Sequence, residues 1–363
     1  MKITRIDAVP VEIPMNATTL SKRRTARTVF VRIQTDSGLT GFGEGAPSSK
    51  TFPGETQETA LTIIRKNLAP SLIGQDPLVI AKIVEQMDAI IQGNNAAKTA
   101  IDLALYDLAG KEKGVPVSVL LGGVVREQLP AFELLPVLDT EATADLVSRL
   151  KDEGVSQFKV KVGTKRSDDM VRLKVTRDTA GADADIKADA NQNWSLQTAI
   201  DFLDAAHDDG LIDVIEQPLP AFDFLELAQL KKSIAVPVMA DESVICFEDG
   251  PNLLRQNVFA FVNLKLSRLG GLYKTKRYAN LCESMGVKAM AGAGFNSKLL
   301  DAAGCHLFAA SSAVVCQELK AVRGFWLKES MTSGVSIEEG MLHVPKEPGL
   351  GMQVDEEIFK RIN

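Results

Sequence analysis

The stretch LIDVIEQPLPAFDFLELAQLKKSIAVPVMADES, residues 211–243, contains one complete copy of the pattern that decides the fold. The apolar runs 211–215 and 236–240 have the length and composition of buried strands, and 222–232 between them has the spacing of a helix. A strand, a helix and a second strand in this order are typical of a parallel βαβ unit.

The same alternation continues on both sides of this stretch. Further strands are predicted at 131–137, 158–162, 185–190, 259–264, 287–290 and 313–319, and further helices at 195–209, 247–256, 271–285 and 298–310. Eight such strands would close into a barrel. An open doubly wound sheet is the main alternative, but it usually has a glycine-rich first turn, and none follows the first strand here. We therefore predict an α/β fold, with a (β/α)7β TIM-type barrel over residues 126–320.

The first 125 residues have a different pattern. Strands are predicted at 3–13, 28–35 and 39–44, with a turn at 36–38, and helices follow at 55–71, 77–92 and 94–112. Residues 1–125 are therefore predicted to form a separate N-terminal α+β domain. Residues 321–363 carry turn and strand patterns, and we expect this C-terminal segment to pack back on the first domain.

Composition narrows the class of protein. Of the 363 residues, 45% are hydrophobic and 24% charged, as in an ordinary globular chain. There is no run of about 18 apolar residues for a membrane helix, and the net charge of −6 argues against nucleic-acid binding. Four cysteines (Cys246, Cys282, Cys305, Cys316) form no CxxC pair, which is typical of reduced thiols. We expect a cytoplasmic enzyme or binding protein.

Five consecutive predicted strands each end in an ionisable residue. In chain order these are Lys161, Asp189, Glu216, Asp241 and Lys265, separated by 28, 27, 25 and 24 residues, about one strand–helix unit each. A single carboxylate at a strand end is more often a helix cap. The carboxyl ends of barrel strands, however, share the rim where barrel active sites are built. The spacing therefore predicts a ring of functional side chains.

Three of these residues, Asp189, Glu216 and Asp241, are neighbouring carboxylates. They would repel one another unless a positive charge lies between them, and unpaired carboxylates next to buried strands are costly. Ligands that are all oxygen favour Mg²⁺ over zinc or copper. The sequence therefore predicts a magnesium site.

The two lysines of the ring, Lys161 and Lys265, end the second and sixth barrel strands, which stand on opposite sides. We expect them to face each other across a substrate, so that a proton can leave one face of a carbon and return to the other. Lys159 shares the inward face of its strand with Lys161, and its like charge should lower the pKa of Lys161. A base and a cation in this layout fit proton abstraction next to a carboxylate.

Several motifs together resemble those of the enolase superfamily, specifically the muconate-lactonizing-enzyme subgroup and, within it, the dipeptide epimerases. They are KVKVG (159–163), ADANQNW (188–194), IEQP (215–218), ADES (240–243), NLKLSRLGG (263–271) and PGLGM (348–352). The resemblance implies that residues 1–125 cap the barrel and that Asp189, Glu216 and Asp241 hold Mg²⁺. It also implies that Lys161 and Lys265 are the acid–base pair, with Lys159 and Asn191 in support, and that the chain is a homo-oligomer.

The same resemblance identifies candidate substrate-binding residues. In this family the loops at 15–28 and 46–56 would close over the substrate, which points to Arg24 and Phe52. On the last two barrel strands, Asn296 stands where dipeptide epimerases have an acid. Glu318 and Lys320 replace their Asp-x-Asp, which pairs with a free ammonium group. A cation at 320 disfavours such a substrate and favours an N-acylated amino acid or a second carboxylate.

The leading functional hypothesis is epimerisation or racemisation of a dipeptide or an N-acyl amino acid through an enediolate. A muconate-type cycloisomerase or an o-succinylbenzoate-type dehydratase at the same site is the alternative, because Glu318-Leu319 resembles the muconate enzymes. A non-catalytic binding protein is the third, and the intact set of metal and base residues argues against it.

Overall fold

The computed structural model describes residues 1–14, 25–48, 54–318 and 331–361. Its N-terminal part begins with a three-stranded antiparallel sheet in the order β1 (Ile3–Pro14), β2 (Thr25–Thr35) and β3 (Thr40–Gly45). The turn at Asp36–Gly38 joins β2 to β3, where Gly38 has a positive φ of 83°. This is the meander that the sequence predicts.

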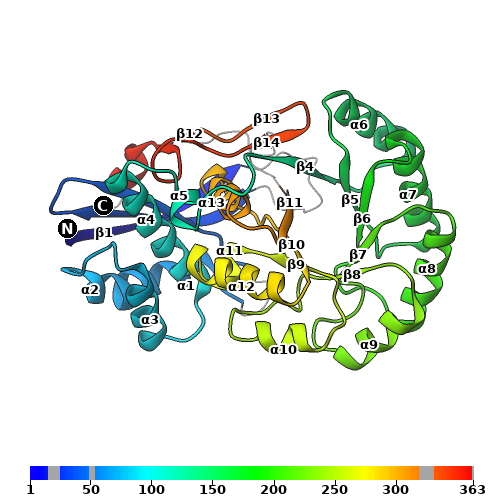
Figure 1. Ribbon diagram of the computed structural model, residues 1–363, viewed down its shortest axis with the longest axis horizontal. Helices are drawn as coiled ribbons and strands as arrows, with labels where there is room; N and C mark the ends of the chain where they lie inside the picture. Colours follow the sequence, from blue (N-terminus) through cyan, green and yellow to red (C-terminus); the bar gives the residue numbers. More distant parts are fainter. Residues whose placement is uncertain (15–24, 49–53, 319–330, 362–363) are drawn as a thin grey trace.

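Helices follow the sheet and cover one of its faces, at the left of Figure 1. A continuous helical stretch consists of α1 (Gln57–Ile63), the π-helix η1 (Ile64–Leu68) and α2 (Ala69–Leu72), and it begins with a capping box between Thr56 and Thr59. Next come α3 (Ile80–Ile90), α4 (Asn95–Lys113) and the short α5 (Val117–Leu120). Helix α4 is buried along most of its length, because both the sheet and the second part of the chain pack on it.

Close contact between β3 and α4 depends on glycine. Gly41, Gly43 and Gly45 alternate along β3, so all three point toward the helix. A Cβ at Gly43 would lie 2.1 Å from the carbonyl oxygen of Ala100, and similar clashes would occur at Gly41 and Gly45. On the helix, the facing residues are alanines four positions apart (Ala96, Ala100, Ala104). The helix backbone therefore lies directly on the sheet.

The second part of the chain is a closed barrel of eight parallel strands, as predicted. The strands are β4 (Gln128–Leu135), β5 (Gln157–Lys161), β6 (Asp185–Asp189), β7 (Val214–Glu216), β8 (Val238–Ala240), β9 (Phe261–Leu264), β10 (Lys288–Ala291) and β11 (Val314–Glu318). They pair in chain order, and β11 pairs with β4 to close the ring. Inside the barrel a small apolar cluster fills the space below the rim: Phe132, Val214, Met239, Met290 and Cys316.

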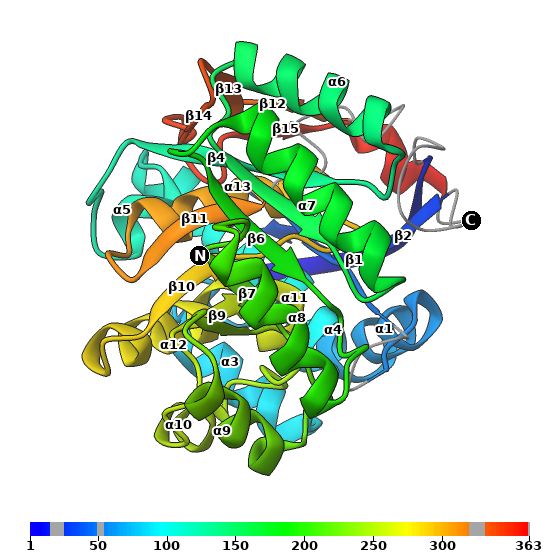
Figure 2. The same cartoon turned by 90° about the vertical axis from the view of Figure 1, so that its right-hand side faces the viewer.

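Seven helical connections join the eight strands around the outside of the barrel. They are α6 (Thr140–Asp152), α7 (Arg166–Ala180), α8 (Leu196–Asp208), α9 (Phe224–Ser233), α10 (Gly250–Arg255), the pair α11 (Leu266–Leu269) and α12 (Leu272–Ser284), and α13 (Lys298–Ala309). Figure 2 shows α6, α7 and α8 in front of the strands that they connect. The fold is thus the predicted (β/α)7β barrel beside an N-terminal α+β part. Helices α5, α6, α7 and α11 are not among the helices predicted from the sequence.

The C-terminal residues contact both parts of the molecule. They form β12 (Met331–Ser333), β13 (Ser336–Glu338), β14 (Met341–His343), β15 (Met352–Val354) and the 3-10 helix η2 (Glu356–Arg361). Strand β14 pairs antiparallel with barrel strand β4, whereas Glu356 forms an ion pair with Arg32 of β2 at 2.8 Å. The tail therefore spans from the barrel to the N-terminal sheet, and domain boundaries near residues 125 and 320 stay a prediction.

Two further findings concern the chain as a whole. No helix in the described ranges is both long and apolar enough to cross a membrane. All four cysteines lie in the described part, and each is a free thiol.

Candidate active site

The predicted ring residues meet at the carboxyl ends of the barrel strands. Lys161 ends β5, Asp189 ends β6 and Glu216 ends β7, and these three residues are neighbours in register across the sheet. Asp241 and Lys265 directly follow β8 and β9. The three carboxylates are buried, whereas the side chains of Lys161 and Lys265 are 21% and 23% exposed. The rim therefore presents two accessible amines above a buried acidic floor.

On one side of the rim, Lys161 faces the Asp189 carboxylate. Its Nζ donates to Asp189 Oδ2 and also, at 2.7 Å, to Oδ1 of Asn191. The amide of Asn191 in turn donates through Nδ2 to Glu242 Oε1 at 3.1 Å. Burial is the largest single influence and lowers the pKa of Lys161, but the charges of Asp189 and Glu216 and the hydrogen bond to Asp189 together outweigh it, so the pKa lies above its ordinary value. The charge of Lys159 does lower the pKa of Lys161, as the sequence predicts. The neighbouring carboxylates raise the pKa by more, so the predicted net lowering does not occur.

On the other side, Lys265 faces Asp241 in a matching arrangement. Its Nζ donates to Asp241 Oδ2 at 2.6 Å, and Arg268 Nη1 donates to Oδ1 of the same carboxylate at 2.9 Å. Burial alone would raise the pKa of Asp241, but Lys265 and Arg268 hold it well below its usual range. Asp241 therefore carries a fixed negative charge.

Lys159 lies at the centre, below the two outer lysines. It is buried, with its Nζ 2.6 Å from Glu216 Oε2, 3.5 Å from Glu318 Oε2 and 3.9 Å from Asp189 Oδ2. Asn263 Nδ2 donates to the other oxygen of Glu216 at 2.9 Å. Lys159 is thus the counter-ion of the acidic floor, in addition to being a like-charged neighbour of Lys161.

The pKa of Glu216 is shifted in the direction opposite to that of Asp241. Burial is the main cause that raises the pKa of Glu216 to about 8; Lys159 opposes the shift, while Asp189 and Asp241 contribute to it. The last effect is electrostatic repulsion among three acids at one rim, which a divalent cation would relieve.

The chemistry of this donor set fits a hard cation. All three side chains offer only oxygen, which suits Mg²⁺. Within the described ranges, no three His, Cys, Asp or Glu side chains are already gathered as a preformed metal site, because each of these carboxylates is drawn to its own cation. The residues therefore fit the ion, and binding it would require these ion pairs to rearrange.

Backbone strain concentrates at the same rim. Asn191, Gln192 and Gln217 adopt left-handed φ angles of 44°, 66° and 36°, which are uncommon for residues other than glycine. The side chain of Gln217 stabilises this path, since its Oε1 accepts from the amides of Asp241 and Ser243 at 3.0 Å each. Such strain is characteristic of functional sites, where the surroundings hold the backbone in place.

The predicted substrate-binding residues are placed differently from one another. Arg24, Phe52 and Lys320 lie outside the described residues. Asn296 is completely buried; its Nδ2 donates to Asp301 Oδ1 at 2.7 Å and its Oδ1 accepts from the amide of Gly294 at 2.8 Å, so it shapes the loop after β10. Glu318 is buried beside Lys159.

Three residues near the carboxylates were not predicted as site residues: Asn263, Arg268 and Glu242. The sequence does contain a signal for two of them. Asn263 precedes Lys265 by two positions and so shares its strand face, and Arg268 follows Lys265 by three positions, about one helical turn.

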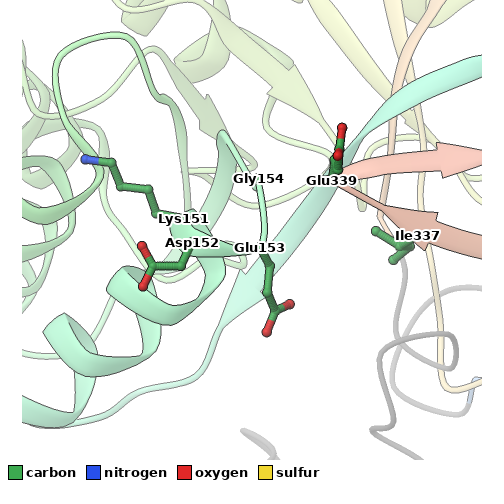
Figure 3. A pocket seen from close by; sticks show the side chains of 6 residues that line it. All are labelled: Lys151, Asp152, Glu153, Gly154, Ile337 and Glu339. Atoms are coloured by element: carbon green, nitrogen blue, oxygen red, sulfur yellow. The ribbon is translucent and has the colours of Figure 1, made fainter.

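A separate pocket of about 410 Å³ lies where the chain passes from α6 toward β5 (Figure 3). Its lining residues, from the end of α6 and the β13–β14 turn, are Lys151, Asp152, Glu153, Gly154, Ile337 and Glu339. Gly154 precedes β5, whereas Lys161 ends it. This pocket is therefore remote from the lysine–carboxylate rim.

A closed parallel barrel with a docked α+β part, and with lysines facing carboxylates at the strand ends, defines the enolase class of enzyme. Two family models match the chain: the mandelate racemase / muconate lactonizing enzyme N-terminal domain over residues 2–122, and the enolase C-terminal domain-like family over residues 142–358. The chain belongs to this family, as its motifs predict.

Named relatives cover nearly the whole chain. N-succinyl-L-Arg/Lys racemase of Bacillus cereus is 29% identical over 100% of this chain and 98% of its own, and its crystal structure superposes with a TM-score of 0.93. Hydrophobic dipeptide epimerase of Enterococcus faecalis is 31% identical over 97% and 99%, and a crystal structure of the dipeptide epimerase from that organism with Mg and L-Leu-L-Tyr has a TM-score of 0.91. Chloromuconate cycloisomerase of Cupriavidus necator is 30% identical over 98% and 97%. These relatives are isomerases, the enzyme class that the sequence predicts.

Proposed function

We propose that this protein is a Mg²⁺-dependent racemase or epimerase that removes and returns the proton next to a substrate carboxylate. The observation that carries the proposal is the pairing at the rim. Two accessible lysines each face a different buried carboxylate, Lys161 with Asp189 and Lys265 with Asp241. Two bases on separate strands are what inversion of a carbon centre requires, since the proton leaves one face and arrives at the other.

In this proposal each group has a defined task. Asp189, Glu216 and Asp241 would hold Mg²⁺, which would supply positive charge to stabilise the enediolate formed at the substrate carboxylate. Lys161 takes the proton from one stereoisomer and Lys265 from the other, and each donates when its partner abstracts. Asn191 orients Lys161, and Lys159 neutralises the acidic floor.

The substrate that these residues favour is an N-acyl amino acid. A dipeptide with a free amino terminus needs a carboxylate to pair with its ammonium group, and Glu318 already lies 3.5 Å from the buried Lys159. An acylated nitrogen carries no charge and makes no such demand. The relative named N-succinyl-L-Arg/Lys racemase supports this choice over the dipeptide epimerases.

Deuterium incorporation tests the proposal directly. The protein would be incubated in D₂O with Mg²⁺ and separate pools of N-succinyl amino acids and L,L-dipeptides, each followed by mass spectrometry. We expect one deuterium to enter the N-succinyl pool, and this exchange to disappear in a Lys161→Ala, Lys265→Ala double variant. Exchange in the dipeptide pool alone would overturn the substrate class. Silence in both pools, with Mg²⁺ binding shown by calorimetry, would overturn racemisation.

The cycloisomerase alternative rests on the similarity to chloromuconate cycloisomerase, which is comparable in identity to the epimerases. Such a reaction needs only one lysine as base. Loss of ultraviolet absorbance on supplying a conjugated muconate would favour it. In that case only one of the two single variants, Lys161→Ala or Lys265→Ala, would lose the activity. Homo-oligomer formation and a cytoplasmic location stay predictions.

A further inference from the structure

One face of helix α4, in the N-terminal part, binds the segment that follows the candidate base Lys265. Thr99 Oγ1 lies 3.1 Å from the carbonyl oxygen of Leu266 and 2.7 Å from that of Asn95, one turn back in α4, so its single proton is shared between these two acceptors. Asn95 Nδ2 donates to the carbonyl of Arg268 at 2.7 Å. One turn further along α4, Asp102 accepts from the amide of Leu272 at 2.5 Å. The three α4 side chains are buried and are spaced by four and three residues, so they form one stripe along the helix.

A second contact reaches the same segment from the residue that follows β3. The backbone amide of Ala46 donates to Ser267 Oγ at 3.0 Å. The short helix α11, residues 266–269, is therefore held at three consecutive positions by groups that come from the first 102 residues of the chain.

Glycines in the segment permit this close approach. Gly271 has a φ of 106°, and a Cβ there would lie 2.3 Å from Asp102 Oδ2. Gly270 has a φ of 91°, and its Cβ position lies 3.6 Å from Asn95 Oδ1. A side chain at position 271 would push α4 away from α11.

Lys161, in contrast, is held from within the barrel. Its backbone carbonyl accepts from Arg172 Nη1 of α7 at 3.0 Å, and Arg172 is itself paired with Asp169 at 2.8 Å. The two lysines of the site are thus anchored by different parts of the molecule, one by the barrel and one by the N-terminal α+β part.

We propose that Asn95 and Thr99 are positioning residues for Lys265, so that the N-terminal part sets the place of one of the two bases. The hydroxyl of Thr99 binds the carbonyl of the residue next to Lys265, and the amide of Asn95 binds the carbonyl of Arg268, which orients Asp241. Loss of these two bonds loosens Lys265 and leaves Lys161 in place. The catalytic consequence rests on the proposed function, whereas the structural consequence does not.

The central variant is Thr99→Val, which keeps the side-chain shape and removes the donor. Thr99→Ser restores the hydroxyl and serves as the rescue. Thr143→Val is the matched control, because Thr143 is equally buried and donates to the carbonyl of Asp139, four residues earlier, but it lies on α6 away from the site. An Asn95→Ala, Thr99→Val double variant removes both bonds.

Two measurements need no substrate. In one, an amine-specific reagent labels the protein briefly, and mass spectrometry compares Lys265 with Lys161 in the same sample. In the other, amide hydrogen exchange is followed across residues 265–272. We expect Thr99→Val to change the Lys265-to-Lys161 labelling ratio and to speed exchange in this segment, and Thr99→Ser and Thr143→Val to match the unchanged protein. An unaltered ratio and unaltered exchange in the double variant would overturn the proposal.

The third measurement uses α-proton exchange from the two enantiomers of one substrate, assigned to each lysine by Lys161→Ala and Lys265→Ala. We expect the double variant to slow the enantiomer served by Lys265 by about tenfold or more, because small displacements of a catalytic group are costly, and to change the other enantiomer less than about twofold. An equal decrease for both would overturn the positioning role. If no substrate exchanges with the unchanged protein, the proposed function fails, and labelling and amide exchange still decide the role of Asn95 and Thr99.

Discussion

Arg268 and Asp241 form a buried ion pair, with 2.9 Å between Nη1 of the arginine and Oδ1 of the aspartate. The same nitrogen donates to the carbonyl of Val244 at 3.2 Å, while Lys265 takes the other carboxylate oxygen at 2.6 Å. The carboxylate of Asp241 is thus fixed by two cations that are one helical turn apart.

We expect Arg268→Gln to destabilise the metal-free protein by ~3 kcal/mol, because breaking a buried pair leaves an uncompensated charge. Urea denaturation would measure the loss. Arg149→Gln, on the exposed face of α6, is the control and should stay within ~0.5 kcal/mol. Equal effects of the two changes would show that the pair contributes nothing particular to folding.

Lys159 offers a second test, since it neutralises buried acids at the rim. Lys159→Met leaves Glu216 and Glu318 without this cation, so the metal-free protein should melt earlier, and added Mg²⁺ should raise Tm more than in the unchanged protein. Lys187→Met is the matched control. Lys187 is equally buried and pairs with Asp185 at 2.6 Å, but Lys187 lies two positions before the end of β6 and so below the rim. This variant should lower Tm without the larger response to Mg²⁺. The idea fails if both variants respond to Mg²⁺ alike.

Because β3 packs closely on α4, the stability cost of replacing a glycine by alanine should depend strongly on where the glycine lies. Gly43→Ala should cost ~2 kcal/mol or more, because its Cβ would overlap the Ala100 carbonyl and the helix would have to move. At Gly294 the nearest atom to an added Cβ is 3.7 Å away, so Gly294→Ala should change the free energy of unfolding by less than ~1 kcal/mol. Chemical denaturation compares the two, and a similar cost at both sites would contradict the packing argument.

Asp102 predicts a pH dependence of stability. Burial raises its pKa to about 8 from an ordinary value of 3.8, against the backbone amides of Leu272 and Tyr273 and the charge of Lys274, which lower it. The folded protein therefore holds a proton that the unfolded chain releases. Its contribution is complete below pH ~4 and is lost as pH rises toward 8, by up to ~1.4 kcal/mol per pH unit. Asp102→Asn should flatten the stability curve in this range, and parallel curves for the two proteins would refute the assignment.

The alternation of strands and helices made the barrel predictable, because each unit repeats one local pattern. The ring from Lys161 to Lys265 was predictable for the same reason. The carboxyl ends of the barrel strands lie at one rim, whichever residues their side chains pair with. The partners themselves depend on tertiary contacts. Glu216 and Glu318 reach Lys159 across the barrel interior, and Asn95 meets Arg268 from 173 positions away. The place of Asn296 likewise depends on a tertiary contact, its hydrogen bond to Asp301 in the first turn of α13.

The ladder of glycines on β3 and alanines on α4 has a consequence for how this protein can diversify. Because α4 packs on the sheet with one side and on the segment after Lys265 with the other, exchanging the first 122 residues with those of a relative would give this segment a different helix face to pack on. On the proposed role of Asn95 and Thr99, such a chimera would place Lys265 correctly only where the incoming helix offers the same two donors.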